Sequence, residues 1–310
     1  MTQILLLYLC MACGFAFGKA SLAYMPPLLF VGARMSIAGL ILVWYQFFFK
    51  KERFVVHLQH GALFAAMCLF HIYGSYALEY WAMQYVSSFK ASLLFNLSPF
   101  VTALLAYFFA NELMTHRKLV GLVVGFIGMT PILLECEAQA DEVCNPTLLL
   151  LAEAALIGSV ICAALGWIFM KRLVKTHEYS PVMINGVSMI VGGGMALITS
   201  YLFETWPTLF VTVDQQGQSL NAGLMTAFFY MALLILLCNI ISYNLYGVLL
   251  RSYSATFLSF AGFLTPLFTA LLSSLLFGQS PSIWFFISVA GVGLGLYLFY
   301  GEELRIAKRM

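Results

Sequence analysis

The chain has 310 residues, of which 62% are apolar and only 9% are charged, whereas an average soluble domain has about 45–50% apolar and about 25% charged residues. This composition excludes an ordinary soluble domain, and the net charge of +2 excludes the strongly basic surface typical of nucleic-acid-binding proteins. With about 20 residues per membrane span, the apolar residues could fill about nine or ten spans. No room remains for a soluble catalytic domain, so an enzyme is not expected.

Apolar runs of span length follow one another along the whole chain. They lie at 3–23, 28–49, 60–80, 87–110, 118–134, 148–170, 182–203, 223–247, 253–277 and 282–300. Within lipid the backbone polar groups of each run must bond inside that run, so the runs must be helices. The first run lacks a basic leader and a cleavage site, which indicates a retained helix and not a signal peptide. The sequence therefore predicts an all-α integral membrane protein with ten transmembrane helices.

The basic residues between these runs predict the orientation. Twelve of the fifteen lie in loops and ends on one side: Lys50, Lys51, Arg53, Arg117, Lys118, Lys171, Arg172, Lys175, Arg251, Arg305, Lys308 and Arg309. The loops at 135–147 and 204–222, on the other side, contain no Lys or Arg. Because cytoplasmic loops are enriched in these residues, both termini are expected in the cytoplasm of a cell, with the bacterial inner membrane as the expected location.

The seven cysteines include two that share a polar outer loop, Cys136 and Cys144. A disulfide is chemically permitted on that side of the membrane, and two free thiols are the alternative. The other five lie in apolar runs and are typical of small core residues. No cysteine or histidine spacing of the zinc type is present, and neither a metal nor a cofactor is expected.

An internal repeat divides the chain. The sequence SPFVTALL at 98–105 matches TPLFTALL at 265–272, and the same shift carries Ser75-Tyr76 onto Ser242-Tyr243 and Glu112 onto Gln279. A second shift carries Lys19 onto Lys171, together with nearby Gly and Phe residues. Two halves of five helices each must have opposite orientations, which is the inverted repeat of alternating-access carriers. The predicted organisation is a first repeat at 1–135, an outer loop at 136–147, a second repeat at 148–300 and a basic tail at 301–310.

The repeated helices carry further motifs. Pro27 and Arg34 lie in the second predicted helix, Asn111-Glu112 and Gly278-Gln279 follow the Pro-bearing fourth and ninth helices, and the fifth and tenth are Gly-rich. In these features the chain resembles the EamA-type branch of the drug/metabolite transporter superfamily. The resemblance implies a secondary transporter of small metabolites whose central cavity is lined mainly by the first, third, fourth, sixth, eighth and ninth helices. Gln279 departs from the family pattern, in which an acid is expected at that position.

Charged residues in the outer half of the predicted bundle are the first candidates for substrate binding. Three cations, Lys19, Arg34 and Lys90, lie in or near spans, and two acids, Glu79 and Glu153, lie at similar depth. A charge inside a membrane is costly and usually has a partner or lines a cavity. Two interpretations stay open: Lys90 or Arg34 with Glu79 or Glu153 recognise a zwitterion, or these residues form ion pairs between helices and snorkel to the interface.

Polar and aromatic residues near the membrane centre form a second set. His71 is the only histidine inside a span, where it could serve proton coupling or bond to a neighbouring helix. Asn96 and Asn239 could bond a substrate or join helices. The aromatic residues on the helices expected to line the cavity could hold a planar group or a cation, or only pack: Phe17, Tyr76, Phe95, Trp167, Tyr243 and Phe263. Four others, Tyr80, Trp81, Trp206 and Trp284, are expected at the membrane interface.

The motifs Gly121-xxx-Gly125 and Gly291-xxx-Gly295 permit close helix contact, and packing within one chain is expected.

No ATP-binding motif occurs, so transport energy must come from a gradient or from exchange. The predicted function is secondary transport of a small polar metabolite, an amino acid or a derivative such as S-adenosylmethionine, which some members of the resembled family carry. The alternatives are an exporter of other metabolites or drugs, a channel-like protein and a membrane protein without transport function. The expected partners are a small-molecule substrate and the lipid bilayer, not nucleic acid, and the chain could be a monomer or a homodimer.

Overall fold

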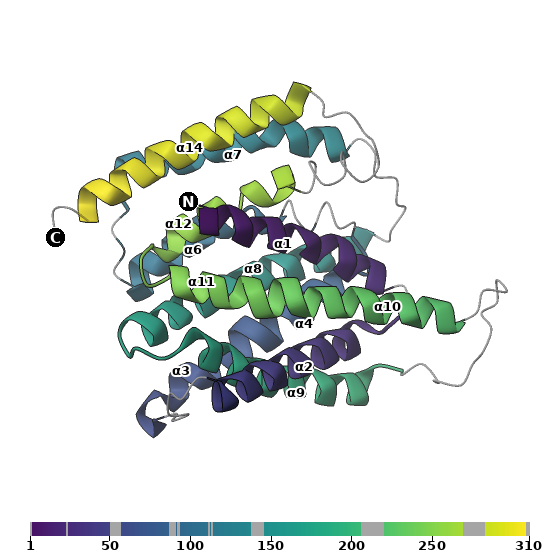
Figure 1. The fold of residues 1–310 in the computed structure, drawn as a ribbon. Helices are drawn as coiled ribbons and strands as arrows, with labels where there is room; N and C mark the ends of the chain where they lie inside the picture. Colours follow the sequence, from purple (N-terminus) through teal and green to yellow (C-terminus); the bar gives the residue numbers. More distant parts are fainter. Residues whose placement is uncertain are drawn as a thin grey trace.

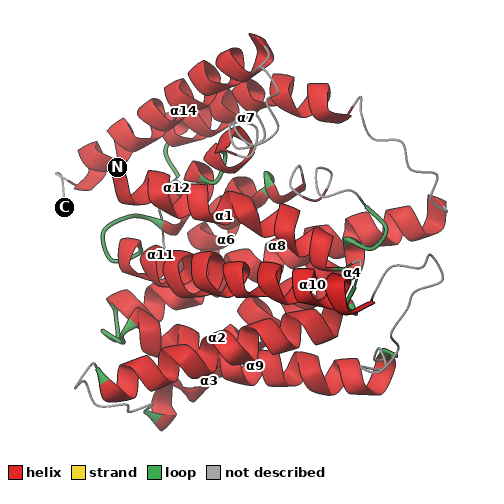
Figure 2. Cartoon of the chain, turned by 45° about the vertical axis from the view of Figure 1, so that its right-hand side comes forward, coloured by secondary structure: helices red, strands yellow, loops and turns green. Residues whose placement is uncertain are grey.

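The computed structural model describes residues 2–22, 24–49, 57–86, 91, 94–110, 112, 114–137, 146–205, 220–268 and 283–307. Every secondary-structure element among these residues is a helix, and none is a strand (Figure 2). The elements before residue 138 are α1 (Thr2–Ser21), α2 (Pro27–Phe48), η1 (Leu58–His60), α3 (Gly61–Ala66), η2 (Met67–Gly74), α4 (Ser75–Ala82), α6 (Ser98–Ala110) and α7 (His116–Glu137). Those after it are α8 (Pro146–Lys175), α9 (Pro181–Phe203), α10 (Leu220–Leu234), η3 (Ile235–Ser242), α11 (Tyr243–Leu249), α12 (Ala255–Ala261) and α14 (Ile283–Ala307).

Six described helical runs are long and apolar enough to cross a membrane: Pro27–Phe48, Leu58–Ala82, Thr147–Lys175, Pro181–Phe203, Met225–Leu249 and Ile283–Glu302. Shorter apolar helices are Thr2–Gly14, Ser98–Phe109 and Ala255–Phe268. The predicted class, an all-helical multi-pass membrane protein, is confirmed. The number of ten spans stays a prediction, because parts of the predicted fourth and ninth spans lie outside the described residues.

Local sequence signals fix where several helices begin. Proline is the first residue of α2, α8 and α9, a position where its missing N–H costs no hydrogen bond and its fixed φ suits the helix. Ser254 caps α12, because its hydroxyl accepts a hydrogen bond from the backbone N–H of Phe257 at 3.0 Å.

The helices pack mainly against partners from the other half of the sequence. α2 lies along α9 and α7 lies along α14, and both pairs run side by side over most of their length (Figure 1). Between these outer pairs, α1 packs on α10 and η3, α4 packs on α8, and α6 packs on α12. The two halves predicted from the repeat therefore share one core.

Glycines allow the closest of these contacts, between α7 and α14. A Cβ atom added to Gly128 would lie 2.6 Å from the Cα of Gly291, and one added to Gly295 would lie 2.6 Å from the carbonyl oxygen of Gly121. Side chains do not fit at such distances, so the two backbones touch directly. The prediction that these glycine motifs pack within one chain is confirmed.

Two of the long helices contain a π-helical segment. η2 and η3 each have 8 residues and continue without a break into the α-helices that carry Tyr76 and Tyr243. The starts of η2 and η3 are separated, within one residue, by the 167 positions that separate these two tyrosines. π-Helical turns are rare and are frequent at functional sites, which directs attention to the region that these two segments enclose.

Candidate substrate-binding cavity

A cavity of about 190 Å³ lies where the central helices meet. One buried water needs roughly 10–15 Å³ of such space, so the cavity has room for a small molecule. Its described lining comes from α1, α2, α4, α8, η3, α11, α12 and residues 95–99 and 262–266. Seven residues predicted as binding residues are in this lining: Arg34, Tyr76, Glu79, Phe95, Asn96, Trp167 and Tyr243. Phe263 lines it as well.

Two tyrosines at repeat-equivalent positions meet in this cavity. The hydroxyl groups of Tyr76 and Tyr243 are 2.5 Å apart, which is a hydrogen bond between α4 of the first half and α11 of the second. Trp167 lies beside Tyr243, with ring centroids 5.1 Å apart, and stacks on Tyr246 at 3.7 Å. Together Tyr76, Trp167, Tyr243 and Tyr246 form an aromatic wall of the cavity.

Arg34 reaches the cavity from α2 and is only 2% exposed. Its Nη1 donates a hydrogen bond to the hydroxyl of Tyr80 at 2.9 Å. Its guanidinium carbon lies 5.4, 4.9 and 5.1 Å from the ring centroids of Phe30, Tyr76 and Tyr80. Ring faces attract a cation, so these rings stabilise the buried charge, while Nε has no hydrogen-bond partner among the described residues.

Glu79 brings the opposite charge to the same cavity. It lies on α4, is 8% exposed and lines the cavity together with Arg34. A carboxylate in such a place can accept hydrogen bonds from an ammonium group or attract another cation. The cavity thus combines a carboxyl group, a guanidinium cation and large aromatic surfaces.

Asn96, Ser98 and Ser259 add polar groups to the described lining. Asn96 is 5% exposed, and its Nδ2 has no hydrogen-bond partner among the described residues. Ser259 of α12 bonds Ser98 at 2.7 Å and accepts a hydrogen bond from Thr102 at 3.2 Å, which joins α6 to α12. An unpaired buried amide is costly, so the Asn96 side chain is suited to donate to a ligand.

Other predicted site residues lie away from this described lining. Phe17 stacks on Tyr230 of α10 at 5.2 Å, and Asn239 donates from Nδ2 to the sulfur of Met35 at 3.0 Å. Glu153 is half-buried on α8.

His71 is 1% exposed and lies behind the aromatic wall, with its ring 4.3 Å from that of Trp167 and 5.2 Å from that of Tyr243. Four further residues singled out in the sequence are not covered. Lys90 and Cys144 lie outside the described residues, as do the side chains of Cys136 and Lys19.

Some lining residues were not predicted from the sequence, and one was predicted at another place. Tyr80 was expected at the membrane interface, but it is 2% exposed and holds Arg34, so that prediction is wrong. Tyr8, whose hydroxyl donates to the carbonyl of Leu258, and Tyr246 were not predicted. For Tyr80 and Tyr246 the sequence spacing could have indicated the cavity. Tyr80 follows Tyr76 by four residues and Tyr246 follows Tyr243 by three, spacings that place side chains on one helix face.

A model of the EamA-like transporter family matches residues 1–134 and 150–301. The chain belongs to the EamA-like transporter family. This membership confirms the resemblance deduced from the sequence motifs, and it makes the chain a transporter and not an enzyme.

Relatives of assigned function support the same class. The chain is 31% identical over 304 residues to the "S-adenosylmethionine/S-adenosylhomocysteine transporter" of Chlamydia muridarum, covering 94% of this chain and 88% of that protein. It is 32% identical over 295 residues to the transporter of the same name in Chlamydia trachomatis serovar L2, with 94% and 86% covered. A "Probable amino-acid metabolite efflux pump" of Salmonella typhimurium is 24% identical over 294 residues, with 94% and 92% covered.

A solved crystal structure aligns with this fold at a TM-score of 0.70 and 15% sequence identity, covering 96% of this chain and 94% of that one. This likeness concerns the fold alone.

Proposed function

We propose that the chain is a secondary carrier for S-adenosylmethionine and S-adenosylhomocysteine, which it moves across the membrane by alternating access. The observation that carries this proposal is the 31–32% identity, over 94% of the chain, to bacterial transporters of that name. The substrate presents a purine ring, an ammonium and a carboxylate, and S-adenosylmethionine adds a sulfonium cation.

The cavity offers a partner for each of these groups. Arg34 is suited to the carboxylate, because guanidinium binds carboxylates with paired hydrogen bonds. Glu79 is suited to the ammonium group, and the faces of Tyr76, Trp167 and Tyr243 are suited to the purine or the sulfonium. Asn96 and Phe95 add an amide donor and a further ring at the same wall. Lys90, Glu153, Phe17 and Asn239 stay proposed residues of the wider substrate path, and His71 stays the candidate for proton coupling.

The proposed architecture is ten spans in two inverted five-helix repeats, at 1–135 and 148–300. Four observations support it. The family model matches the chain twice, at 1–134 and 150–301. The tyrosines that bond each other are 167 residues apart, which is the repeat offset. Both halves contain a π-helical segment at equivalent places. Each central helix packs on a partner from the other half.

The proposed location is a bacterial inner membrane with both termini in the cytoplasm. The distribution of Lys and Arg supports this orientation. The start of α1 and the end of α14 also lie toward the same end of the molecule (Figure 1). The related transporters come from bacteria.

The test is uptake of radiolabelled S-adenosylmethionine into proteoliposomes that contain the purified protein. We expect saturable uptake that unlabelled S-adenosylhomocysteine inhibits, and faster uptake when the liposomes are preloaded with S-adenosylhomocysteine. Faster uptake into preloaded liposomes separates a carrier from a channel, because only in a carrier does substrate bound on the far side speed the return of the binding site. Absence of both uptake and competition by these two compounds would contradict the substrate proposal.

A second candidate is export of amino acids or their metabolites. The Salmonella relative supports it, and the opposite charges of Arg34 and Glu79 alone would fit a free amino acid. The same assay separates the two candidates: free amino acids at equal concentration should compete as well as S-adenosylmethionine only if the second is correct.

A further inference from the structure

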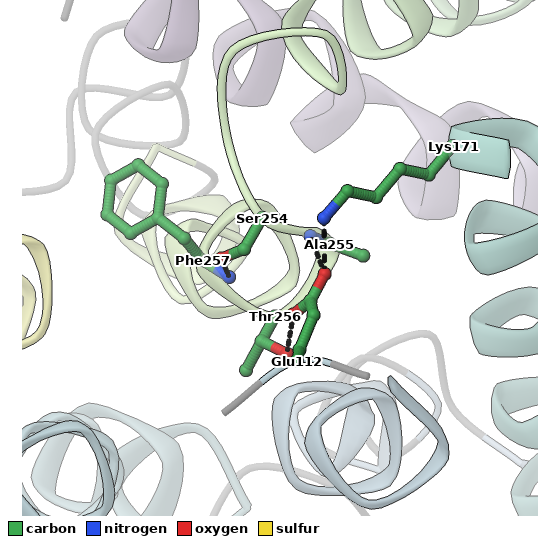
Figure 3. A network of polar contacts seen from close by, with 6 residues as sticks. All are labelled: Glu112, Lys171, Ser254, Ala255, Thr256 and Phe257. Atoms are coloured by element: carbon green, nitrogen blue, oxygen red, sulfur yellow. Dashed lines mark hydrogen bonds and ion pairs between the residues drawn. The ribbon is translucent and has the colours of Figure 1, made fainter. Parts of the chain in front are cut away.

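A charged network joins three helix ends on one side of the cavity. Glu112, between α6 and α7, accepts a hydrogen bond from Nζ of Lys171 at 2.5 Å, near the end of α8 (Figure 3). The same oxygen, Oε1, accepts the backbone N–H of Ala255 at 3.0 Å, and Oε2 accepts the hydroxyl of Thr256 at 2.8 Å. Ala255 and Thr256 are the first residues of α12. One carboxylate from the first half therefore ties together two helices of the second half.

The network lies directly beyond the cavity, at the end of the molecule where the loops carry Lys and Arg, here called the basic end. Ser259, one helical turn after Ala255, lines the cavity, and the neighbouring residue Leu258 accepts a hydrogen bond from Tyr8 of α1. In the structure α12 is thus bonded directly to α1 and α6, and it is bonded to α8 through the carboxylate of Glu112. A passage at this end would require α12 to move away from α8, which would break the bonds of Glu112.

The carboxylate is suited to a strong contact. The side chains of Glu112 and Lys171 are only 12% and 16% exposed, so water screens the pair weakly. Burial raises the pKa of Glu112. The charge of Lys171 and the hydrogen bonds from Lys171, Thr256 and Ala255 lower this pKa by more, so it lies below its usual value. A carboxyl whose pKa is depressed keeps its charge until the pH falls below that value. The ion pair is therefore present at neutral pH.

The sequence supplies this carboxylate in one half only. Glu112 corresponds, at the repeat offset, to Gln279, and Lys171 corresponds to Lys19. Gln279 lies outside the described residues. Its side-chain amide is neutral, so it does not carry the charge with which Glu112 attracts a lysine.

We infer that Glu112 and Lys171 form a charged gate at the basic end, and that their ion pair biases the substrate-free carrier toward the state closed at that end. This inference rests on the proposed alternating-access function. Opening the basic end separates α12 from α8 and breaks the pair, whereas opening the other end leaves it intact. Removing either charge therefore favours the state open at the basic end.

The test measures access to the cavity without any substrate. A single cysteine replaces Ser259 in a background whose seven native cysteines are substituted and whose fold is checked by size-exclusion chromatography. A membrane-impermeant maleimide is added to spheroplasts and to inverted membrane vesicles, which expose opposite ends of the protein. A cysteine at the exposed position Ser252 reports which preparation presents the basic end.

For Glu112→Gln we expect the labelling rate at position 259 to rise about tenfold from the basic end, which corresponds to a shift of about 1.4 kcal/mol in the conformational equilibrium. Labelling from the other end should fall. Lys171→Met should give the same change, and the double variant should add little, because each single change already removes the pair. Lys171→Met alone carries the test if Glu112→Gln does not fold.

The matched control is Glu302→Gln. Glu302 is also 12% exposed and pairs with Arg117 at 3.7 Å and Arg305 at 3.9 Å, but it lies on α14 outside the cavity lining. It should not change labelling. Unchanged labelling in Glu112→Gln or in Lys171→Met, or an equal rise in Glu302→Gln, would overturn the gate. Because no substrate is added, a gate effect without S-adenosylmethionine transport would refute only the substrate proposal, and the reverse result would refute only the gate.

Discussion

The outer helix pairs and the centre of the molecule are built in different ways. In α2 with α9 and in α7 with α14, glycines bring backbones into contact: a Cβ on Gly39 would lie 2.7 Å from the backbone nitrogen of Ile190, and one on Gly291 would lie 2.5 Å from the Cα of Gly128. The centre instead contains large aromatic side chains, a cavity and a few polar bonds such as that between Tyr76 and Tyr243. Backbone contacts of this kind leave little freedom to slide, whereas polar bonds between side chains can break and form again. We therefore expect each outer pair to move as a unit while the central contacts change.

The largest expected effect comes from breaking an outer pair. Gly291→Ala should destabilise the protein by about 3 kcal/mol, the upper part of the usual range for overpacking, because a backbone atom cannot rotate away. Gly293→Ala, on the same helix with nothing within 4 Å of the added Cβ, should be neutral or slightly stabilising. Thermal unfolding in detergent measures both. Equal melting temperatures for the two variants would contradict the backbone contact.

A change at the cavity should affect transport more than stability. Glu79→Gln keeps the shape of the side chain but removes its charge, and hydrogen bonds to charged groups contribute about 1.5–3 kcal/mol. We expect roughly a 10- to 100-fold loss of affinity for S-adenosylmethionine in the uptake assay, with an unchanged melting temperature. Glu302→Gln serves again as the control for loss of an acid. Normal affinity in Glu79→Gln would remove this residue from the proposed site.

A smaller effect is expected at the contact between the two halves. Tyr76→Phe and Tyr243→Phe each remove one hydroxyl of a single hydrogen bond, which is worth about 0.5–1.5 kcal/mol. The double variant should cost little more than either single one, because the bond is already lost. Thermal unfolding of the unmodified protein, the two single variants and the double variant gives this double-mutant cycle. Strictly additive losses would mean that the hydroxyls act independently.

The smallest effect is expected for His71→Asn. If His71 couples transport to protons, uptake at alkaline pH should stay within about twofold of the unmodified protein, because both side chains are neutral there. The pH dependence of uptake between about 5.5 and 7.5 should become flat. A pH profile that keeps its slope would leave His71 a packing partner of Trp167 and nothing more.

The sequence was sufficient for features that repeat or that depend on composition. Apolar run length predicted the helical membrane class, and the glycine spacing predicted the close packing of α7 with α14. The repeat brought Tyr76 and Tyr243 into correspondence, although it did not predict that they touch.

Features that depend on helix rotation or on distant partners were not predictable. α1 is apolar around its circumference, so no pattern indicated that Phe17 faces Tyr230 and not the cavity. Tyr80 lies near a span end, where an aromatic ring usually faces lipid headgroups, and only the position of Arg34 on another helix makes it a buried partner. Lys171 and Glu112 are 59 residues apart, and counting loop charges predicts orientation without predicting which charges meet.

The π-helical segments η2 and η3 give each half one residue more than an α-helix of the same length would need. In an α-helix each residue turns the chain by about 100°. Winding the same residues as a regular α-helix would turn Tyr76 by about this angle relative to the helix before it. Deleting one residue from η2, for example the exposed Leu69, would instead restore regular winding and keep Tyr76 on the same face. η2 and η3 therefore keep α4 and α11, with Tyr76 and Tyr243, in line with the helices before them, although the side chains within the π-segments depart from α-helical spacing.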